Sequence, residues 1–141
     1  MTSRLQFPAL LALLAAPPAV AELVVVANAG SGVERLSRDE VINIFLGRYR
    51  QLPSGLAALP IDQPAEQPLK AQFYRKLVNK DLAEINAYWA RLIFSGKTSP
   101  PRQAASAAEV MAWLVRTPGA IGYVERGMVD ARLRIVMEFE P

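Results

Sequence analysis

Cysteine and histidine are both missing from this chain of 141 residues. Without cysteine, the fold has no disulfide bonds and is held by the burial of apolar side chains alone. Without histidine, there is no Ser-His-Asp or Cys-His catalytic group, no histidine metal ligand and no histidine general base. The acidic residues show no spacing typical of a paired catalytic site. We therefore expect a protein that is not an enzyme and has no metal or cofactor.

The charge of the chain is nearly balanced, with 16 Lys and Arg residues against 13 Asp and Glu residues and a net charge of +3. This balance is too even to indicate a nucleic-acid partner. The length suffices for one domain with a real core, but not for two.

The first residues have the layout of a secretory signal peptide. Arg4 precedes an apolar run at 5–16, and the small-x-small triplet at 19–21 precedes Glu22. The run of about 12 residues is shorter than the roughly 20 that a membrane-spanning helix needs. We expect residues 1–21 to be removed, leaving residues 22–141 as a single domain in the periplasm. No cysteine follows the run, which argues against a lipoprotein anchor.

Segments typical of strands and helices alternate along the rest of the chain. The expected strands lie at 23–27, 55–62, 120–124 and 133–137, and the expected helices follow Ser37, Pro68, Asp81 and Ser106. The uninterrupted apolar run at 23–27 indicates a strand covered on both faces. Interleaved strands and helices predict an α/β fold with a mixed or mostly parallel sheet flanked by helices.

Helix caps and apolar faces can be read from the same pattern. Ser37 and Ser106 each precede a glutamate by three residues, which is the spacing of a capping box, and Asp81 is a further N-cap. The helix after Asp81 is expected to bury an apolar face that extends to Ile93. In the last helix, Trp113 is expected on the buried face.

Several motifs together resemble one family. They are Leu36-Ser37-x-x-Glu40-x-x-x-Ile44-Phe45-Leu46-Gly47, then Phe73-Tyr74-Arg75, Tyr88-Trp89 and Gly96, and finally Thr117-Pro118-Gly119-Ala120-Ile121-Gly122-Tyr123-Val124. In order and spacing they are similar to the periplasmic phosphate-binding proteins of phosphate ABC transporters. The resemblance is to short members of this substrate-binding-like family that consist of one lobe.

The resemblance implies half of a two-lobed molecule in which phosphate is held between the lobes. The chain looks most like the second lobe, which in the family contributes an Arg-x-x-Gly-Ser-Gly-Thr stretch at a helix N-terminus. Aligned on Phe73, the arginine position falls at Gln63 and the last four positions fall at 66–69, where the sequence is Glu-Gln-Pro-Leu. The anion donors of the family are therefore absent, since Pro68 has no N–H and Leu69 has no hydroxyl.

Two segments are candidates for ligand binding. The turn Gly30-Ser31-Gly32 lies between a strand and a helix, where its backbone N–H groups can form an anion nest; the alternative is an ordinary flexible turn. Gln63 and Gln67 lie between a strand end and a helix start, where they can bind a small polar ligand. The alternative for this loop is a solvent-facing connection.

The expected function is that of a periplasmic solute-binding-like protein related to the phosphate-transport binding proteins, with weak or no phosphate binding when alone. The partner is then a small anion such as phosphate. The alternative is a non-transport scaffold that docks on a membrane or envelope protein. Both a monomer and a homodimer are compatible with the sequence.

Overall fold

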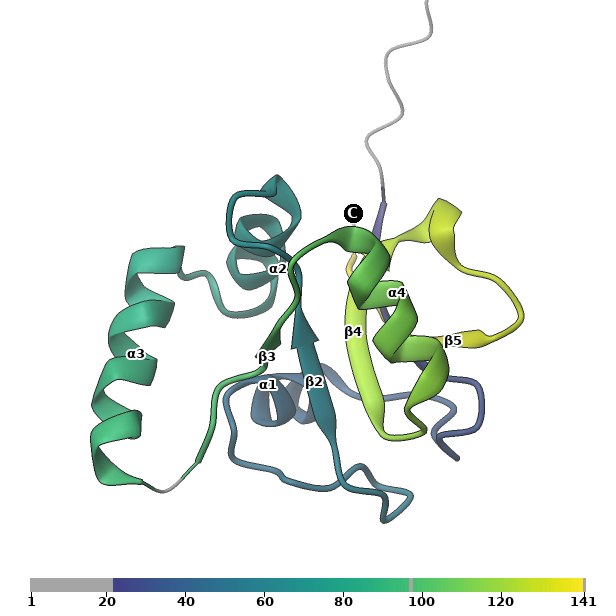
Figure 1. Ribbon diagram of the computed structural model, residues 1–141, viewed down its shortest axis with the longest axis horizontal. Coiled ribbons are helices and arrows are strands. Elements are labelled where there is room, and N and C mark those ends of the chain that lie inside the picture. The colour runs from purple at the N-terminus through teal and green to yellow at the C-terminus, as the bar shows by residue number, and fades with distance from the viewer. Residues whose placement is uncertain (1–21, 97, 141) are drawn as a thin grey trace, which may run out of the picture.

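A mixed five-stranded β-sheet lies at the centre of the structure, with helices against both faces (Figure 1). The computed structural model describes residues 22–96 and 98–140, so the expected signal peptide at 1–21 lies outside the described residues. The strands are β1 (Leu23–Asn28), β2 (Leu59–Asp62), β3 (Arg102–Gln103), β4 (Ala120–Glu125) and β5 (Leu133–Glu138). The helices are α1 (Arg38–Phe45), α2 (Pro68–Val78), α3 (Leu82–Ser95) and α4 (Ala107–Arg116), with a short 3₁₀ helix η1 (Arg126–Met128).

The strand order is β3-β2-β4-β1-β5. Strand β2 pairs in parallel with β3 and β4, whereas β1 is antiparallel to both β4 and β5. The expected α/β class is therefore confirmed, with a mixed sheet. Because β2, β3 and β4 run the same way, their carboxyl ends meet at one edge of the sheet. Ligands of open α/β sheets bind outside the carboxyl ends of the strands, so this edge is the first place to look for a site.

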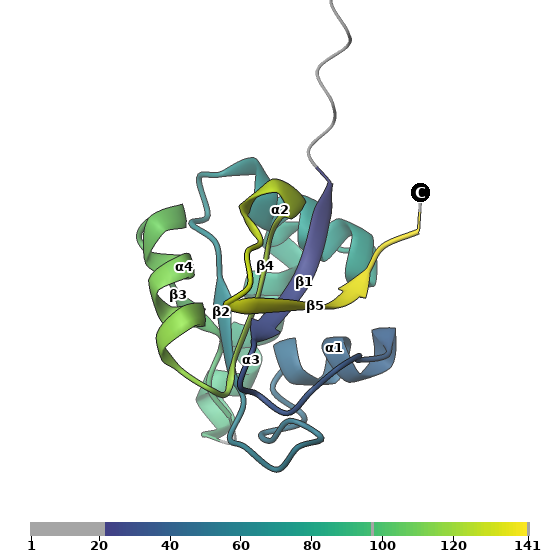
Figure 2. The ribbon, with the colours of Figure 1, turned by 90° about the vertical axis from the view of Figure 1, so that its right-hand side faces the viewer.

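Strand β1 is covered on both faces, as its unbroken apolar sequence indicates. Val25 and Ala27 belong to one buried cluster with residues of α1, α2 and α3, and Val24 and Val26 belong to a second cluster with residues of α4. Figure 2 shows α4 on one side of the sheet and α1 on the other. The sheet thus separates two cores, and α2 and α4 begin on opposite sides of it.

The predicted caps are present. The Ser37 and Asp81 side chains each accept a hydrogen bond from the N–H three residues on, and each glutamate there reaches back to complete a capping box. Ser106 accepts from the N–H of Glu109 and caps α4, but Glu109 does not return the bond that would complete the expected capping box. Helix α2 differs, because it begins at Pro68 and no side chain caps its first turn.

Strand β2 is shorter than expected, since it begins at Leu59 rather than near residue 55. The residues before it form a tight turn, in which Gln51 bridges Ala57 and the N–H of Leu52 donates to the carbonyl of Leu56 at 2.8 Å. The backbone N–H and C=O groups of this turn bond to one another, so they do not pair with the sheet as those of a longer strand would.

The apolar face expected on α3 does not extend to Ile93. Only Ile85 and Trp89 of this helix are buried, whereas Ile93 is 57% exposed and Phe94 is 93% exposed. Helix α3 lies at the periphery (Figure 1), and Ile93 and Phe94 of its last turn are not part of the buried cluster that contains Ile85 and Trp89. Helical periodicity shows which residues share a face, but not how far a neighbour covers that face.

Trp113 is half-buried rather than buried. On α4 only Val110 and Leu114 are fully inside, and Trp113 lies at the border of this apolar stripe. The Arg102 guanidinium lies 3.9 Å from the centre of the indole ring, in cation–π contact. The expectation that Trp113 lies on the buried face therefore holds only in part, because its side chain packs against the cluster that contains Val110 and Leu114 but stays partly exposed.

Arg126 joins the two ends of the described chain. Its Nε donates to Glu22 at 2.8 Å, its Nη2 also bonds Glu138, and its N–H donates to the Glu22 carbonyl at 2.7 Å. The start of β1 and the end of β5 are thus held at the same place. No helix among the described residues is long and apolar enough to cross a membrane.

Candidate functional site

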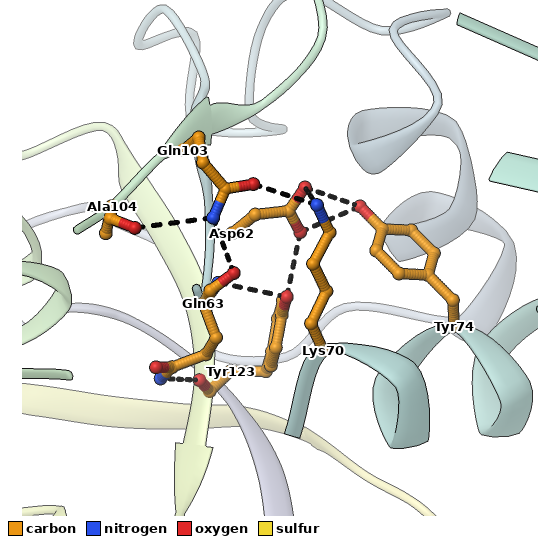
Figure 3. Close-up of polar contacts among 7 residues, drawn as sticks. All are labelled: Asp62, Gln63, Lys70, Tyr74, Gln103, Ala104 and Tyr123. Carbon is orange, nitrogen blue, oxygen red and sulfur yellow. Dashed lines mark hydrogen bonds and ion pairs between the residues drawn. The ribbon is translucent and has the colours of Figure 1, made fainter. Parts of the chain in front are cut away.

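A buried carboxylate, Asp62, ends strand β2 at the edge of the sheet identified above (Figure 3). The hydroxyl of Tyr123 on β4 donates to its Oδ1 at 2.8 Å, and the hydroxyl of Tyr74 on α2 donates to the same oxygen at 2.8 Å. Both phenols are fully buried, and Phe73 stacks on Tyr123 with ring centres 3.8 Å apart. Asp62 therefore ties α2 and β4 to the end of β2.

Lys70 and Gln103 extend this network toward strand β3. The Lys70 ammonium lies 3.7 Å from Asp62 Oδ2 and donates to Gln103 Oε1 at 2.8 Å. Gln103 Nε2 in turn donates to the carbonyl of Gln63 at 2.7 Å. A basic side chain in the first turn of α2 is thus directed into the protein and is occupied by internal partners (Figure 3).

The charges of the network follow from its burial. Burial raises the pKa of Asp62, against the opposing effects of the Lys70 charge and of the hydrogen bonds from the two tyrosines. Burial, followed by the charge of Asp62, raises the pKa values of Tyr74 and Tyr123 far above the ordinary value. Both phenols therefore keep their protons and act as donors.

Gln63 is the next residue after Asp62 and is almost completely buried, with 4% of its surface exposed. Its N–H donates to the Tyr123 hydroxyl at 3.0 Å and its Nε2 donates to the Tyr123 carbonyl at 2.9 Å. Its Oε1 accepts no hydrogen bond from the described residues. Since no buried polar side-chain atom in the described ranges lacks a partner, this oxygen reaches accessible space.

Gln63 lines a cavity of about 300 Å³ over the carboxyl ends of β2 and β4. Its lining comes from the loop after β2, the first turns of α2 and α4, the end of β4, and η1. The lining residues are Gln63, Gln67, Pro68, Leu69, Gln72, Ala107, Met111, Val124, Glu125 and Met128. The cavity therefore combines three amides and one carboxylate with an apolar wall.

The electrostatics of this cavity are unlike those of a phosphate site. No Lys or Arg is among its lining residues, and Glu125 contributes a carboxylate that makes no ion pair within the described ranges. The positive end of α2 is present, but Pro68 at its first position has no N–H to offer. Glu66 is exposed in the adjoining loop.

The structure brings together Gln63 and Gln67, two of the site residues expected from the sequence, as lining of one cavity. Gln67 is exposed and precedes α2, and its N–H donates a hydrogen bond to the carbonyl of Pro64 at 3.0 Å. Gln72, Glu125 and Met128 were not expected. Gln72 lies one turn after Pro68, so its place near this helix start could have been expected from the sequence. Glu125 and Met128 come from a distant part of the sequence.

The turn Gly30-Ser31-Gly32 lies at the opposite end of the sheet, because it follows β1, which runs antiparallel to β4. The N–H of Gly30 donates to Asn28 Oδ1 at 2.7 Å and the N–H of Ser31 donates to the Asn28 carbonyl at 2.9 Å. Ser31 Oγ accepts from the N–H of Val33 at 3.1 Å. Two amides of the expected nest are thus bonded within the turn, and these three residues are separate from the cavity.

Comparison with known proteins shows similarity in fold. No protein-family model and no curated protein matches the chain. A Clostridium perfringens protein classed as a phosphate ABC transporter substrate-binding protein, solved with bound phosphate, matches with a TM-score of 0.65 and 12% identity over 82% of this chain and 44% of its own. An ABC-type phosphate transport receptor from Vibrio cholerae matches with a TM-score of 0.64 and 14% identity, over 82% of this chain and 45% of its own.

A possible phosphate binding protein from Planctomyces limnophilus also matches, with a TM-score of 0.57 and 14% identity, over 85% of this chain and 45% of its own. The chain thus spans less than half the length of each of these solved structures. The described residues therefore have the fold of a single lobe of a phosphate ABC transporter substrate-binding protein, as the sequence motifs indicated.

Proposed function

We propose that this protein is an exported solute-binding-like lobe that holds a small polar solute in the cavity between α2 and α4, and that it binds phosphate weakly or not at all when alone. The observation that supports this proposal is the lining of the cavity, which has amides and Glu125 but no Lys or Arg. The neighbours in fold are transport proteins, which favours binding over catalysis.

Phosphate is disfavoured at this cavity by both charge and donors. At neutral pH the anion would approach Glu125 and Glu66 with no facing arginine or lysine to offset the repulsion. Lys70 is close in sequence, but its ammonium is held by Asp62 and Gln103 inside the protein. The helix end alone supplies only part of the attraction that an anion needs.

The direct test is calorimetric titration of residues 22–141 with inorganic phosphate. We expect a dissociation constant weaker than about 1 mM, which corresponds to less than about 4 kcal/mol of binding free energy. The double substitution Glu66→Gly with Pro68→Gly restores a flexible donor loop and is expected to strengthen binding. Glu34→Gly is a matched control, because Glu34 is exposed and far from the cavity lining. A micromolar dissociation constant for the unmodified protein would contradict the proposal.

Export is part of the proposal and has its own test. If residues 1–21 act as a signal peptide, the protein recovered from the periplasm begins at Glu22. Intact-mass measurement on the periplasmic fraction decides this, and a species that retains Met1 would count against export.

A second function, as a docking scaffold for a membrane or envelope protein, is favoured by one observation. The last described turns of α3 expose Ile93 and Phe94, the latter almost completely. Exposed aromatic residues of this kind are typical of protein contacts. Cross-linking in cells through a photoreactive residue at position 94, with position 128 as the comparison, tests this function. Light scattering distinguishes a monomer from a homodimer.

A further inference from the structure

The cavity between α2 and α4 contains acceptor groups that nothing in the described chain uses. Gln63 is almost fully buried, and its Nε2 is fixed by the Tyr123 carbonyl, so its Oε1 is held in one orientation. Gln63 lines the cavity, and its Oε1 accepts no hydrogen bond from the described residues. Glu125, at the end of β4, also lines the cavity and has no ion-pair partner there. An unpaired amide oxygen and a carboxylate at one cavity favour a cationic donor, such as an ammonium group.

The start of α2 borders the same cavity. Pro68 and Leu69 line it, no side chain caps this helix, and the N–H groups of Leu69 and Lys70 have no hydrogen-bond partner within the described ranges. The other three helices have N-cap side chains that accept from their first turns. The positive end of an uncapped helix of 11 residues favours a single carboxylate.

The rest of the cavity is apolar. Met111 of α4, Val124 of β4 and Met128 of η1 line it, and Met128 is half-exposed at its rim. Methionine side chains adapt to ligands of different shape because they are unbranched and polarizable. A volume of about 300 Å³ is at the small end of ligand sites, which run from about 300 to 1,000 Å³, and therefore fits a small metabolite rather than a sugar chain or a cofactor.

We propose that the ligand is a zwitterion with an apolar side chain, a free α-amino acid of the size of leucine or methionine. Its carboxylate binds the first-turn N–H groups of α2, its ammonium group binds Gln63 Oε1 and Glu125, and its side chain packs against Met111 and Met128. The ligand has no net charge, which matches a cavity with one carboxylate and one positive helix end. Phosphate satisfies only the helix end and is repelled by the carboxylate.

This inference rests on the proposed solute-binding function of the cavity, and the probes are chosen to test the two separately. Residues 22–141 are titrated by calorimetry with L-leucine, L-methionine, 4-methylvalerate, isoamylamine and inorganic phosphate. The fourth probe is leucine without its carboxylate, and the third is leucine without its ammonium group. We expect leucine or methionine to bind at least tenfold more tightly than either truncated analogue or phosphate.

Glu125→Gln locates the ligand, because Glu125 is exposed and its loss leaves no unpaired partner. This substitution is expected to weaken leucine binding at least fivefold and to leave 4-methylvalerate unchanged, whereas Glu34→Gln is expected to change neither. A thermal melt of each variant verifies that it is folded.

The outcomes are distinguishable. If an analogue binds as tightly as leucine, the zwitterion is refuted while the solute-binding function stands. If leucine binds equally well to Glu125→Gln, the assignment to this cavity is refuted. If neither amino acid binds at 10 mM and phosphate binds at micromolar concentration, both this inference and the proposed function fail.

Discussion

Replacing Tyr123 by Phe removes one oxygen atom that has two separate roles in the buried network. The hydroxyl donates to the Asp62 carboxylate at 2.8 Å and accepts from the N–H of Gln63 at 3.0 Å. A hydrogen bond to a charged group contributes about 1.5 to 3 kcal/mol, and a buried N–H left without a partner costs about 1 to 3 kcal/mol. The ring and its stacking on Phe73 are retained, so packing changes little. We expect a loss of about 3 kcal/mol in the free energy of unfolding.

Urea denaturation followed by tryptophan fluorescence and circular dichroism measures this loss. Tyr74→Phe is the matched comparison, because its hydroxyl donates to Asp62 but accepts nothing from the described residues, and its loss is expected to be smaller. Tyr49→Phe, at an exposed position, is expected to change the free energy by less than about 0.5 kcal/mol. A loss below about 1 kcal/mol for Tyr123→Phe, or one equal to that of Tyr74→Phe, would refute the reasoning.

Three further predictions concern stability. Burial raises the pKa of Asp62 above its ordinary value of 3.8, so the Asp62 carboxyl binds a proton more tightly in the native state than in the unfolded state. The stabilisation that results from this tighter proton binding is lost as the pH rises from 3.8 through the raised pKa. In urea melts at several pH values, the stability of the wild type relative to Asp62→Asn should fall over this range; a constant difference would count against the assignment. Gly119→Ala places a methyl group against the Ala57 carbonyl oxygen and should cost about 3 kcal/mol or more, whereas Gly127→Ala, with open space around it, should cost under about 1 kcal/mol. Trp113→Ala should lower the free energy of unfolding by about 2 kcal/mol, which is less than the loss expected for a fully buried tryptophan. A loss above about 4 kcal/mol in the same melts would contradict the view that the partial exposure of Trp113 reduces its contribution.

Local signals in the sequence were sufficient for the helix starts. A capping box depends on two side chains three residues apart, so Ser37 and Asp81 could be assigned without knowledge of the fold. The same holds for β1, where a continuous apolar run requires cover on both faces. The resemblance to one lobe of the phosphate-binding proteins also came from motifs within single elements, and the similarity in fold confirms it.

The buried network could not be read from the sequence in the same way. Asp62 and Tyr123 are separated by 61 positions, and their contact exists only because β2 and β4 pair in parallel. The burial of Asp62 depends on α2 folding back over the strand end, which brings Tyr74 and Lys70 to the carboxylate. Gln63 and Gln67, which the sequence offers as candidates, line the cavity next to β2, and their role in binding stays a prediction. The place of Glu125 beside them depends on which strand pairs with β2.

The Arg126 bridge between Glu22 and Glu138 has a consequence for how this domain can be connected. The two ends of the described fold lie at the same place. The distance between the ends therefore does not fix the order in which the elements follow one another along the chain. A short flexible linker can close the two ends, and new termini can then be opened in an exposed turn such as the one around Gly55. For the same reason the domain can be inserted into a surface loop of a host protein, with both connections at one place.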